Sequence, residues 1–158
     1  MQINVVEKIS LHMRDLSVEE LLKSIDSIDD LEQRDRDGRT LLINAAFCRC
    51  TEIVRYLLSQ NVNVNAVDKS GFSALHAAVQ ENCIEIVDLL LNAGADINIR
   101  NQFGNPPIWG ITGSSSPDLI KLLMRSGADP HIKNNFGIST FEGMVAYPNI
   151  LDILNHQY

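Results

Sequence analysis

Hydrophobic positions along the chain follow two alternating patterns. The first is a stripe at i, i+1, i+4 and i+5, which gives a helix one broad apolar face. It occurs three times, within residues 53–58, 86–91 and 119–124. The second is a shorter apolar segment that contains small residues, such as 45–46 and 77–78, and it precedes the stripe. These patterns predict pairs of helices, with small side chains that let neighbouring helices approach closely.

Polar turn signals separate the helix pairs at a fixed spacing. Gly38, Gly71, Gly104 and Gly137 stand 33 residues apart, and an Asp or Asn lies three residues before each of them. Asp or Asn at the first position and Gly at the fourth favour a type I turn. Four such signals in register predict repeated units, each reading turn, helix, turn, helix.

Helix boundaries are also marked in the sequence. Thr40 and Ser73 suit the N-cap position of the first helices, and Pro107 suits the first helical position in the third unit. The second helices are expected to end at residues that tolerate a left-handed backbone, Asn61, Gly94 and Gly127. Before the first unit we expect a short helix within residues 3–13, and a second helix that Ser17 opens with a capping box.

The segment Asp68-Lys69-Ser70-Gly71-Phe72-Ser73-Ala74-Leu75-His76-Ala77-Ala78, with the later Gly94-Ala95-Asp96, resembles the ankyrin repeat. The resemblance covers about residues 34–158 and implies an all-α solenoid of stacked helix pairs with projecting hairpins. We expect one domain, 1–158, made of N-terminal capping helices 1–33, repeats 34–66, 67–99 and 100–132, and a shortened capping repeat 133–158.

The third unit departs most from the family pattern. The family's usual histidine in the first helix is present only as His76, and Trp109 takes its place in the third unit. Gly110 and Gly113 fall in the same segment, and each glycine costs a helix about 1 kcal/mol relative to alanine. The first helix of this unit is therefore expected to be the weak point of the array.

Composition narrows the class of protein. The chain has 158 residues, 45% hydrophobic and 21% charged, which is typical of a soluble globular protein. Its net charge of -7 argues against nucleic-acid binding, and no apolar run is long enough to span a membrane. The N-terminus lacks the features of a signal peptide. Three cysteines without a CxxC pair favour a reduced, cytoplasmic location.

The sequence does not suggest catalysis. Cys48 and Cys50 are separated by one residue, and Cys50 and Cys83 occupy equivalent places in adjacent units, so packing is the simplest interpretation for all three. The histidines show no metal-ligand spacing, and the glycines do not form a phosphate-binding loop. We therefore predict a protein that is not an enzyme and has no cofactor or metal.

Charges are distributed unevenly. Residues 1–33 hold eight acids and three bases, either as a solvated cap or as an acidic patch that a basic partner recognises. The hairpins and their flanks carry six of the 13 basic residues, namely Arg34, Arg36, Arg39, Lys69, Arg100 and Lys133. This concentration of positive charge favours a partner with an acidic surface.

Aromatic residues stand beside these bases. Phe72, Phe103 and Phe136 either stack on one another as local packing or form an exposed binding ridge, and Trp109 is either core filler or an interface anchor. The candidate partner-binding residues are Arg36, Arg39, Lys69, Phe72, Arg100, Phe103, Asn105, Trp109, Phe136 and Tyr147.

The leading hypothesis is a non-catalytic module, monomeric when free, that binds one protein through its hairpins and concave surface. Small proteins of the ankyrin type often resemble inhibitors or accessory proteins, and an immunity protein that neutralises a cognate toxin is one concrete version. The alternative is a structural scaffold subunit of a larger complex. An enzyme or small-molecule binder is disfavoured, because no polar groups show the spacing of a deep site.

Overall fold

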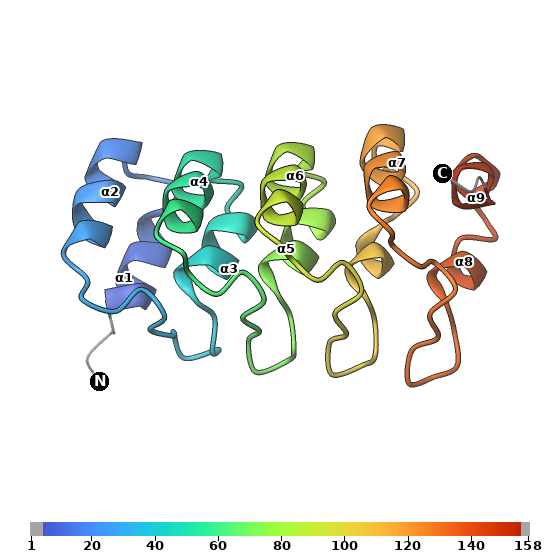
Figure 1. The fold of residues 1–158 in the computed structure, drawn as a ribbon, viewed down its shortest axis with the longest axis horizontal. Helices are drawn as coiled ribbons and strands as arrows, with labels where there is room; N and C mark the ends of the chain where they lie inside the picture. Colours follow the sequence, from blue (N-terminus) through green and yellow to red (C-terminus); the bar gives the residue numbers. More distant parts are fainter. Residues whose placement is uncertain (1–4, 156–158) are drawn as a thin grey trace.

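The computed structural model describes residues 5–155 and shows helices stacked in two rows, with hairpins below them (Figure 1). The inner row contains α1, α3, α5, η1 and α8, and the outer row contains α2, α4, α6, α7 and α9. The bounds are α1 Val5–His12, α2 Val18–Asp26, α3 Leu41–Phe47, α4 Thr51–Ser59, α5 Ala74–Gln80, α6 Ile84–Asn92, η1 Pro107–Gly110, α7 Pro117–Arg125, α8 Thr140–Gly143 and α9 Pro148–Asn155.

The predicted helix boundaries are confirmed. Thr40 and Ser73 are the N-caps of α3 and α5, and Ser17 and Glu20 form the capping box of α2. Asn61 follows the end of α4 with a φ of 55°, in the left-handed region. At the N-terminus, α1 begins at Val5, and residues 3 and 4 of the predicted helix lie outside the described part of the chain.

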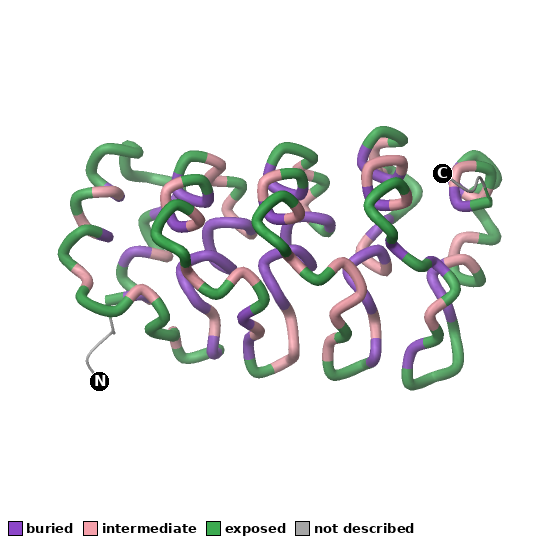
Figure 2. Tube along the Cα trace, in the orientation of Figure 1, coloured by how far each residue is buried: buried purple, intermediate pink, exposed green. Residues whose placement is uncertain are grey.

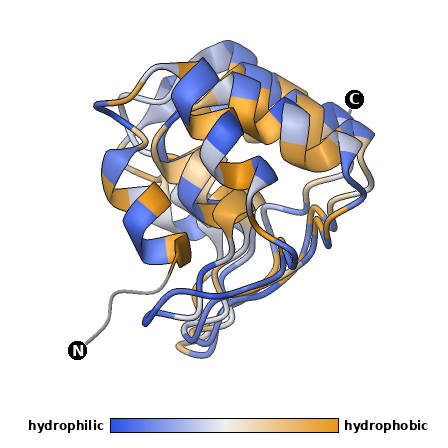
Figure 3. Cartoon of the chain, turned by 90° about the vertical axis from the view of Figure 1, so that its left-hand side faces the viewer, coloured by the Kyte–Doolittle hydropathy of each residue, from blue (hydrophilic) through white to orange (hydrophobic). Residues whose placement is uncertain are grey.

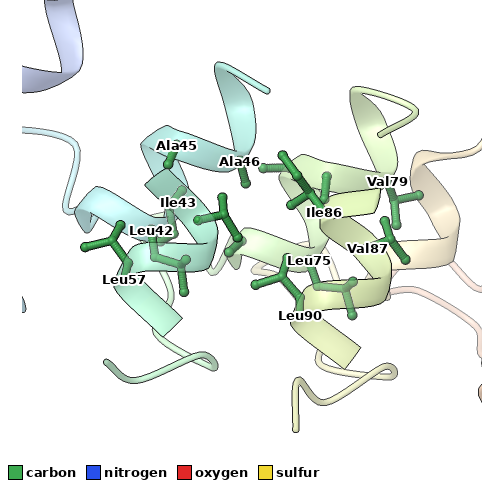
Figure 4. Close-up of a cluster of buried hydrophobic side chains, with 14 of the residues drawn as sticks. Leu42, Ile43, Ala45, Ala46, Leu57, Leu75, Val79, Ile86, Val87 and Leu90 are labelled. Atoms are coloured by element: carbon green, nitrogen blue, oxygen red, sulfur yellow. The ribbon is translucent and has the colours of Figure 1, made fainter. Parts of the chain in front are cut away.

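The core lies between the two helix rows and runs along the array (Figure 2). The stripe residues of the outer helices, such as Leu57, Leu90 and Leu123, are fully buried. Figure 4 shows Leu57 and Leu90 beside the buried leucines of the inner helices, Leu42 and Leu75. Because each unit packs against its neighbours, no unit buries its apolar face alone. The architecture is the all-α ankyrin-type solenoid that the sequence predicts, and residues 5–155 contain isolated β-bridges but no strands.

The first helix of the third unit is shorter than the repeat pattern predicts. Only residues 107–110 are helical there, as one 3-10 turn, whereas the matching helix α5 has seven residues. Pro106 is the N-cap of this turn, so it cannot supply the side-chain cap that Ser73 gives α5. Gly110 then ends the turn, and residues 112–116 form a polar loop before α7. The segment in which the glycines predict a weak point is thus a short 3-10 helix in place of an α-helix.

Candidate protein-binding surface

The hairpins project from one side of the stack and overlap when the array is viewed end on (Figure 3). Each is held by its own first residue. In the second hairpin, Asp68 Oδ1 accepts bonds from the N–H groups of Ser70 (2.8 Å) and Phe72 (2.9 Å), and Gly71 adopts a φ of 78°. Burial raises the pKa of Asp68, but these bonds and that from the Ser70 hydroxyl outweigh it, so the pKa lies below its usual value.

Consecutive hairpins are joined by a ladder of backbone hydrogen bonds that repeats in register. The bonds run from Lys69 N to Asp37 O (3.1 Å), from Gln102 N to Ser70 O (2.9 Å) and from Asn135 N to Phe103 O (2.9 Å). At the N-terminal end the equivalent donor is Arg36 N–H, which bonds to Oε1 of Glu7 at 3.1 Å. A side chain of α1 therefore takes the place that a preceding hairpin would occupy.

Several of the predicted binding cations also link hairpins. Arg100 donates from Nη2 to the carbonyl of Lys133 at 2.9 Å, Lys69 donates from Nζ to the carbonyl of Arg36 at 2.6 Å, and Arg34 donates to the second hairpin. Arg100 and Lys69 remain exposed. Because the acceptors of Arg100 and Lys69 are neutral carbonyl oxygens, these two bonds leave both positive charges uncompensated.

Lys133 lies 3.5 Å from a Glu142 carboxylate oxygen, and the remaining two hairpin cations, Arg39 and Arg36, differ from each other. Arg39 is half-buried, lies 3.5 Å from an Asp68 carboxylate oxygen and places its guanidinium 4.7 Å from the centre of the Phe47 ring. Arg36 is 78% exposed, with its Nε 3.8 Å from Glu7. Arg36 is therefore the more accessible of the two.

The three hairpin phenylalanines do not form one stack. Phe72 stacks on Phe47, with ring centres 5.9 Å apart, and also contacts the His76 ring at 4.7 Å. Phe103 and Phe136 are 47% and 72% exposed. The reason lies in the register, since Phe72 follows its turn glycine whereas Phe103 and Phe136 precede theirs. Phe72 therefore faces the inner helices, and the other two rings stand at hairpin tips.

A hollow of about 400 Å³ lies between the second and third units, and we call it the aromatic hollow. It is enclosed by the tips of two hairpins, by α5 and by η1, and it has no charged side chain in its lining. The lining residues are Ser70, Phe72, His76, Gln80, Asn101, Phe103, Asn105, Pro106, Pro107, Trp109, Gly110 and Thr112.

The structure brings four of the predicted residues to this hollow, with different roles. Phe72, Phe103 and half-buried Trp109 contribute rings. Asn105 is an internal link, because its carbonyl accepts a bond from His76 Nε2 at 3.1 Å and its Oδ1 accepts one from Asn134 at 2.9 Å. Asn105 therefore holds neighbouring units together, and its two oxygens are already bonded within the protein.

The other six predicted residues lie outside this hollow: Arg36, Arg39, Lys69, Arg100, Phe136 and Tyr147. Arg36 and Arg39 line a second hollow of about 410 Å³, described below, and Tyr147 follows α8, where its ring occupies the space that a Cβ on Gly113 would need. Tyr147 is 41% exposed. It therefore packs against the loop of the third unit rather than joining the aromatic hollow.

The second hollow, between α1 and the first hairpin, contains both signs of charge, and we call it the charged hollow. Its lining residues are Glu7, Ser10, Leu11, Arg14, Asp35, Arg36, Asp37, Arg39, Asn44, Phe47, Cys48 and Glu81.

Sequence reasoning missed Phe47, which lines the charged hollow, and Gln80, which lines the aromatic hollow, although both occupy one register position near the end of an inner helix. That shared position was the available signal.

His76 is buried and its ring is fixed from both sides. Nδ1 lies 3.2 Å from the Ser73 N–H, which needs an acceptor, and Nε2 lies 3.1 Å from the Asn105 carbonyl, which needs a donor. This arrangement fits the neutral ring with its proton on Nε2. Burial lowers the pKa of His76, although the Asn105 bond and the charge of Asp68 oppose the shift. The ring is a structural clasp between two units.

Neither a metal centre nor a disulfide is formed in residues 5–155. These residues contain no group of three His, Cys, Asp or Glu side chains placed to hold a metal ion, and the three cysteines are free. Cys50 donates to the Met13 carbonyl at 3.3 Å, and burial raises the pKa of its thiol. In the same part of the chain, no helix has the length and apolar character needed to cross a bilayer.

Comparison with known proteins identifies the family. The model of ankyrin repeats in three copies matches residues 11–101, which is more than half of the chain. The chain belongs to the ankyrin repeat family. An ankyrin repeat domain-containing protein of monkeypox virus, OPG015, is 42% identical over 52 residues, and this segment covers 33% of the present chain and 12% of the viral protein.

Membership of the ankyrin family agrees with the surface described above. Ankyrin repeats are generally non-enzymatic modules that bind other proteins, and the hairpins and inner helices offer two adjacent hollows on one side of the array. The family specifies the scaffold, and the binding properties depend on the side chains that this chain places on it.

Proposed function

We propose that the protein is a non-catalytic binding module that holds one partner protein against its hairpins and inner helices. The observation that supports this proposal is the row of cations along the hairpin edge. Lys69 and Arg100 donate to carbonyl oxygens, and Arg36 is mostly exposed although its Nε lies 3.8 Å from Glu7, so these side chains are accessible to a partner. In a chain of net charge -7, such a row favours an acidic partner surface.

We further propose that binding acts by covering part of the partner, as an inhibitor or an accessory protein does. An immunity protein that neutralises a cognate toxin is one form of this function, and a cytoplasmic location and a monomeric free state remain predictions. A structural scaffold subunit is the alternative. Such a subunit would migrate in a stable higher assembly on size-exclusion chromatography, whereas an inhibitor would reduce an activity of its purified partner.

The test begins with affinity capture of a partner from the source cells and continues with binding kinetics of the purified pair. The double variant Arg36→Glu/Lys69→Glu should associate at least tenfold more slowly and lose salt dependence, because charges at an interface rim act mainly on association. Arg100 is left intact because its guanidinium donates to two hairpin carbonyls, of Gly104 and Lys133, whereas Lys69 donates to one.

The matched control reverses two exposed acids of the N-terminal cap, Glu19→Lys/Asp29→Lys. It should leave association unchanged or slightly faster. If this control abolishes binding while the edge variant binds normally, the partner is basic and occupies the acidic cap, and the proposed surface is wrong.

A further inference from the structure

We propose that the aromatic hollow binds an apolar side chain of a partner segment that carries Asp or Glu residues beside it. This inference rests on the proposed function and specifies the chemistry of the partner. It commits to an extended acidic peptide segment as the occupant. A basic segment or an uncharged small molecule in the same hollow would be a different occupant, and the experiment below separates them.

The hollow results from an unusual local sequence. Where α5 begins with a serine cap and continues for seven residues, the third unit has two prolines and a single 3-10 turn. Gly110 lets this turn approach α5, because a Cβ there would lie 3.3 Å from Gln80 N and Val79 Cγ1. The shortened turn leaves a recess beside α5 that a full helix would have filled.

The lining favours an apolar side chain. Rings of Phe72, Phe103 and Trp109 line the recess together with two prolines, and charged side chains are absent from its lining. A volume of about 400 Å³ falls at the small end of protein ligand pockets, which suits one large side chain and its backbone better than a cofactor. Aromatic residues in such positions are frequent interface anchors.

Cations flank the hollow on the hairpin side. Lys69 directly precedes the lining residue Ser70, and Arg100 directly precedes the lining residue Asn101. Both are exposed and bond to neutral carbonyls of the hairpins on either side, Lys69 to Arg36 and Arg100 to Lys133, so a segment that runs along the hairpin edge would carry residues on both sides of its anchor past a positive charge. Charge complementarity therefore assigns carboxylates to those neighbouring positions.

The hollow also offers a hydrogen-bond donor, the indole N–H of Trp109. Among residues 5–155, no acceptor bonds to the indole N–H of half-buried Trp109, whereas the ring nitrogens of His76 are both engaged. The indole N–H can therefore donate to a backbone carbonyl of the bound segment. Such a bond would orient the segment without selecting its side chains.

The experiment is selection from a displayed library of random twelve-residue peptides on the full chain. We expect enriched sequences to share an aromatic or aliphatic residue within two positions of Asp or Glu. Binding of synthetic copies should change the emission of Trp109, which is the only tryptophan in the chain. Enrichment of basic or uncharged peptides, or no enrichment at all, would overturn the proposal.

The chain offers a matched pair of variants. Phe103 lines the hollow, and Phe136 stands at the equivalent position 33 residues later, outside it. Phe103→Ala should weaken the selected peptides at least tenfold, whereas Phe136→Ala should change their affinity less than twofold. Both rings are exposed at hairpin tips, so circular dichroism should show two folded variants. Equal weakening by both variants, or by neither, places the peptides elsewhere.

The outcomes for this inference and for the proposed function are separable. If a captured partner binds Phe103→Ala as tightly as it binds the unmodified chain, but binds Arg36→Glu/Lys69→Glu weakly, the hollow is not its anchor site and the module function stands. If the partner binds both variants as tightly as the unmodified chain, while acidic peptides still require Phe103, the hollow is a peptide site and the proposed surface for the protein partner is wrong.

Discussion

The second and third units are built on the same register, but their inner segments differ in sequence, and three of the differences explain the change in structure. Ser73, His76 and Ala77 in the second unit correspond to Pro106, Trp109 and Gly110 in the third. In the second unit, Ser73 caps α5, His76 bonds to the next unit through the Asn105 carbonyl, and the small Ala77 is buried. The corresponding residues of the third unit produce one 3-10 turn and a hollow lined by rings. The third unit therefore has a shorter inner helix than the second and an accessible hollow beside it.

The largest expected difference concerns the outer helices, where the two units share a buried leucine. Leu90→Ala should cost about 2–5 kcal/mol, because it leaves a cavity between complete helix pairs. Leu123→Ala, at the equivalent position of α7, should fall at the low end of that range because the thin inner turn can collapse toward it. Urea unfolding measures both, and equal losses would show that the third unit is as rigidly packed as the second.

Substitution of His76 in the second unit should lower the free energy of unfolding more than substitution of Trp109, its counterpart in the third. His76→Leu leaves the buried Ser73 N–H without its ring acceptor, which should cost about 1–3 kcal/mol. Trp109→Phe, at the matching position, removes an N–H without a partner among the described residues together with part of a half-buried ring, and it should cost less than His76→Leu, about 1 kcal/mol or below. Thermal or urea unfolding of the two variants gives the comparison directly. A costly Trp109→Phe would indicate a hidden structural role for the indole.

Hydrogen exchange should distinguish the inner segments. Amides of residues 108–115 should exchange about tenfold faster than those of residues 75–81, because a single turn and a loop open more easily than a capped helix. The measurement is made on the free protein and repeated with a bound peptide. Similar protection of the two segments in the free protein would contradict the weakness of the third unit.

The smallest expected effect is a dependence of stability on pH that arises from the second unit. The pKa of buried His76 is lowered, so the unfolded chain binds this proton more readily than the folded chain does. Stability should be complete above about pH 6.5 and decline as the pH falls below it, by at most ~1.4 kcal/mol per pH unit for one proton. Urea midpoints between pH 7.5 and 5.5 test this, and His76→Leu should remove the decline.

Features with local causes could be predicted from the sequence. Turn glycines, serine and threonine caps and the helix stripes each depend on residues a few positions apart, and their predictions are confirmed by Gly71, Ser73 and Leu90. A departure from the helical pattern around Gly110 was also predictable. Its extent was not, because whether a helix with two prolines shortens or kinks depends on the packing of α5 against it.

Features of the candidate surface depend on contacts between units, and these were less accessible. The role of Arg100 could not be foreseen, since the carbonyl that it binds lies 33 residues away in the chain. The same holds for the stack of Phe72 on Phe47, two residues that occupy different register positions. Composition correctly indicated which residue types gather at the hairpins, but only the stacking of the units shows which of them remain available.

Because Glu7 closes the hairpin ladder at one end, the two ends of the array differ in how readily another hairpin could be added. A repeat grafted before α1 would have to displace this carboxylate from Arg36 before it could join the ladder. At the opposite side, the carbonyl of Phe136 has no backbone donor among the described residues, and a Cβ on Gly137 would meet nothing within 4 Å, whereas one on Gly71 would lie 2.9 Å from Asn101. A scaffold of this kind should therefore be easier to lengthen after the fourth hairpin than before the first, because within residues 5–155 only the fourth hairpin has an unused backbone acceptor in the ladder.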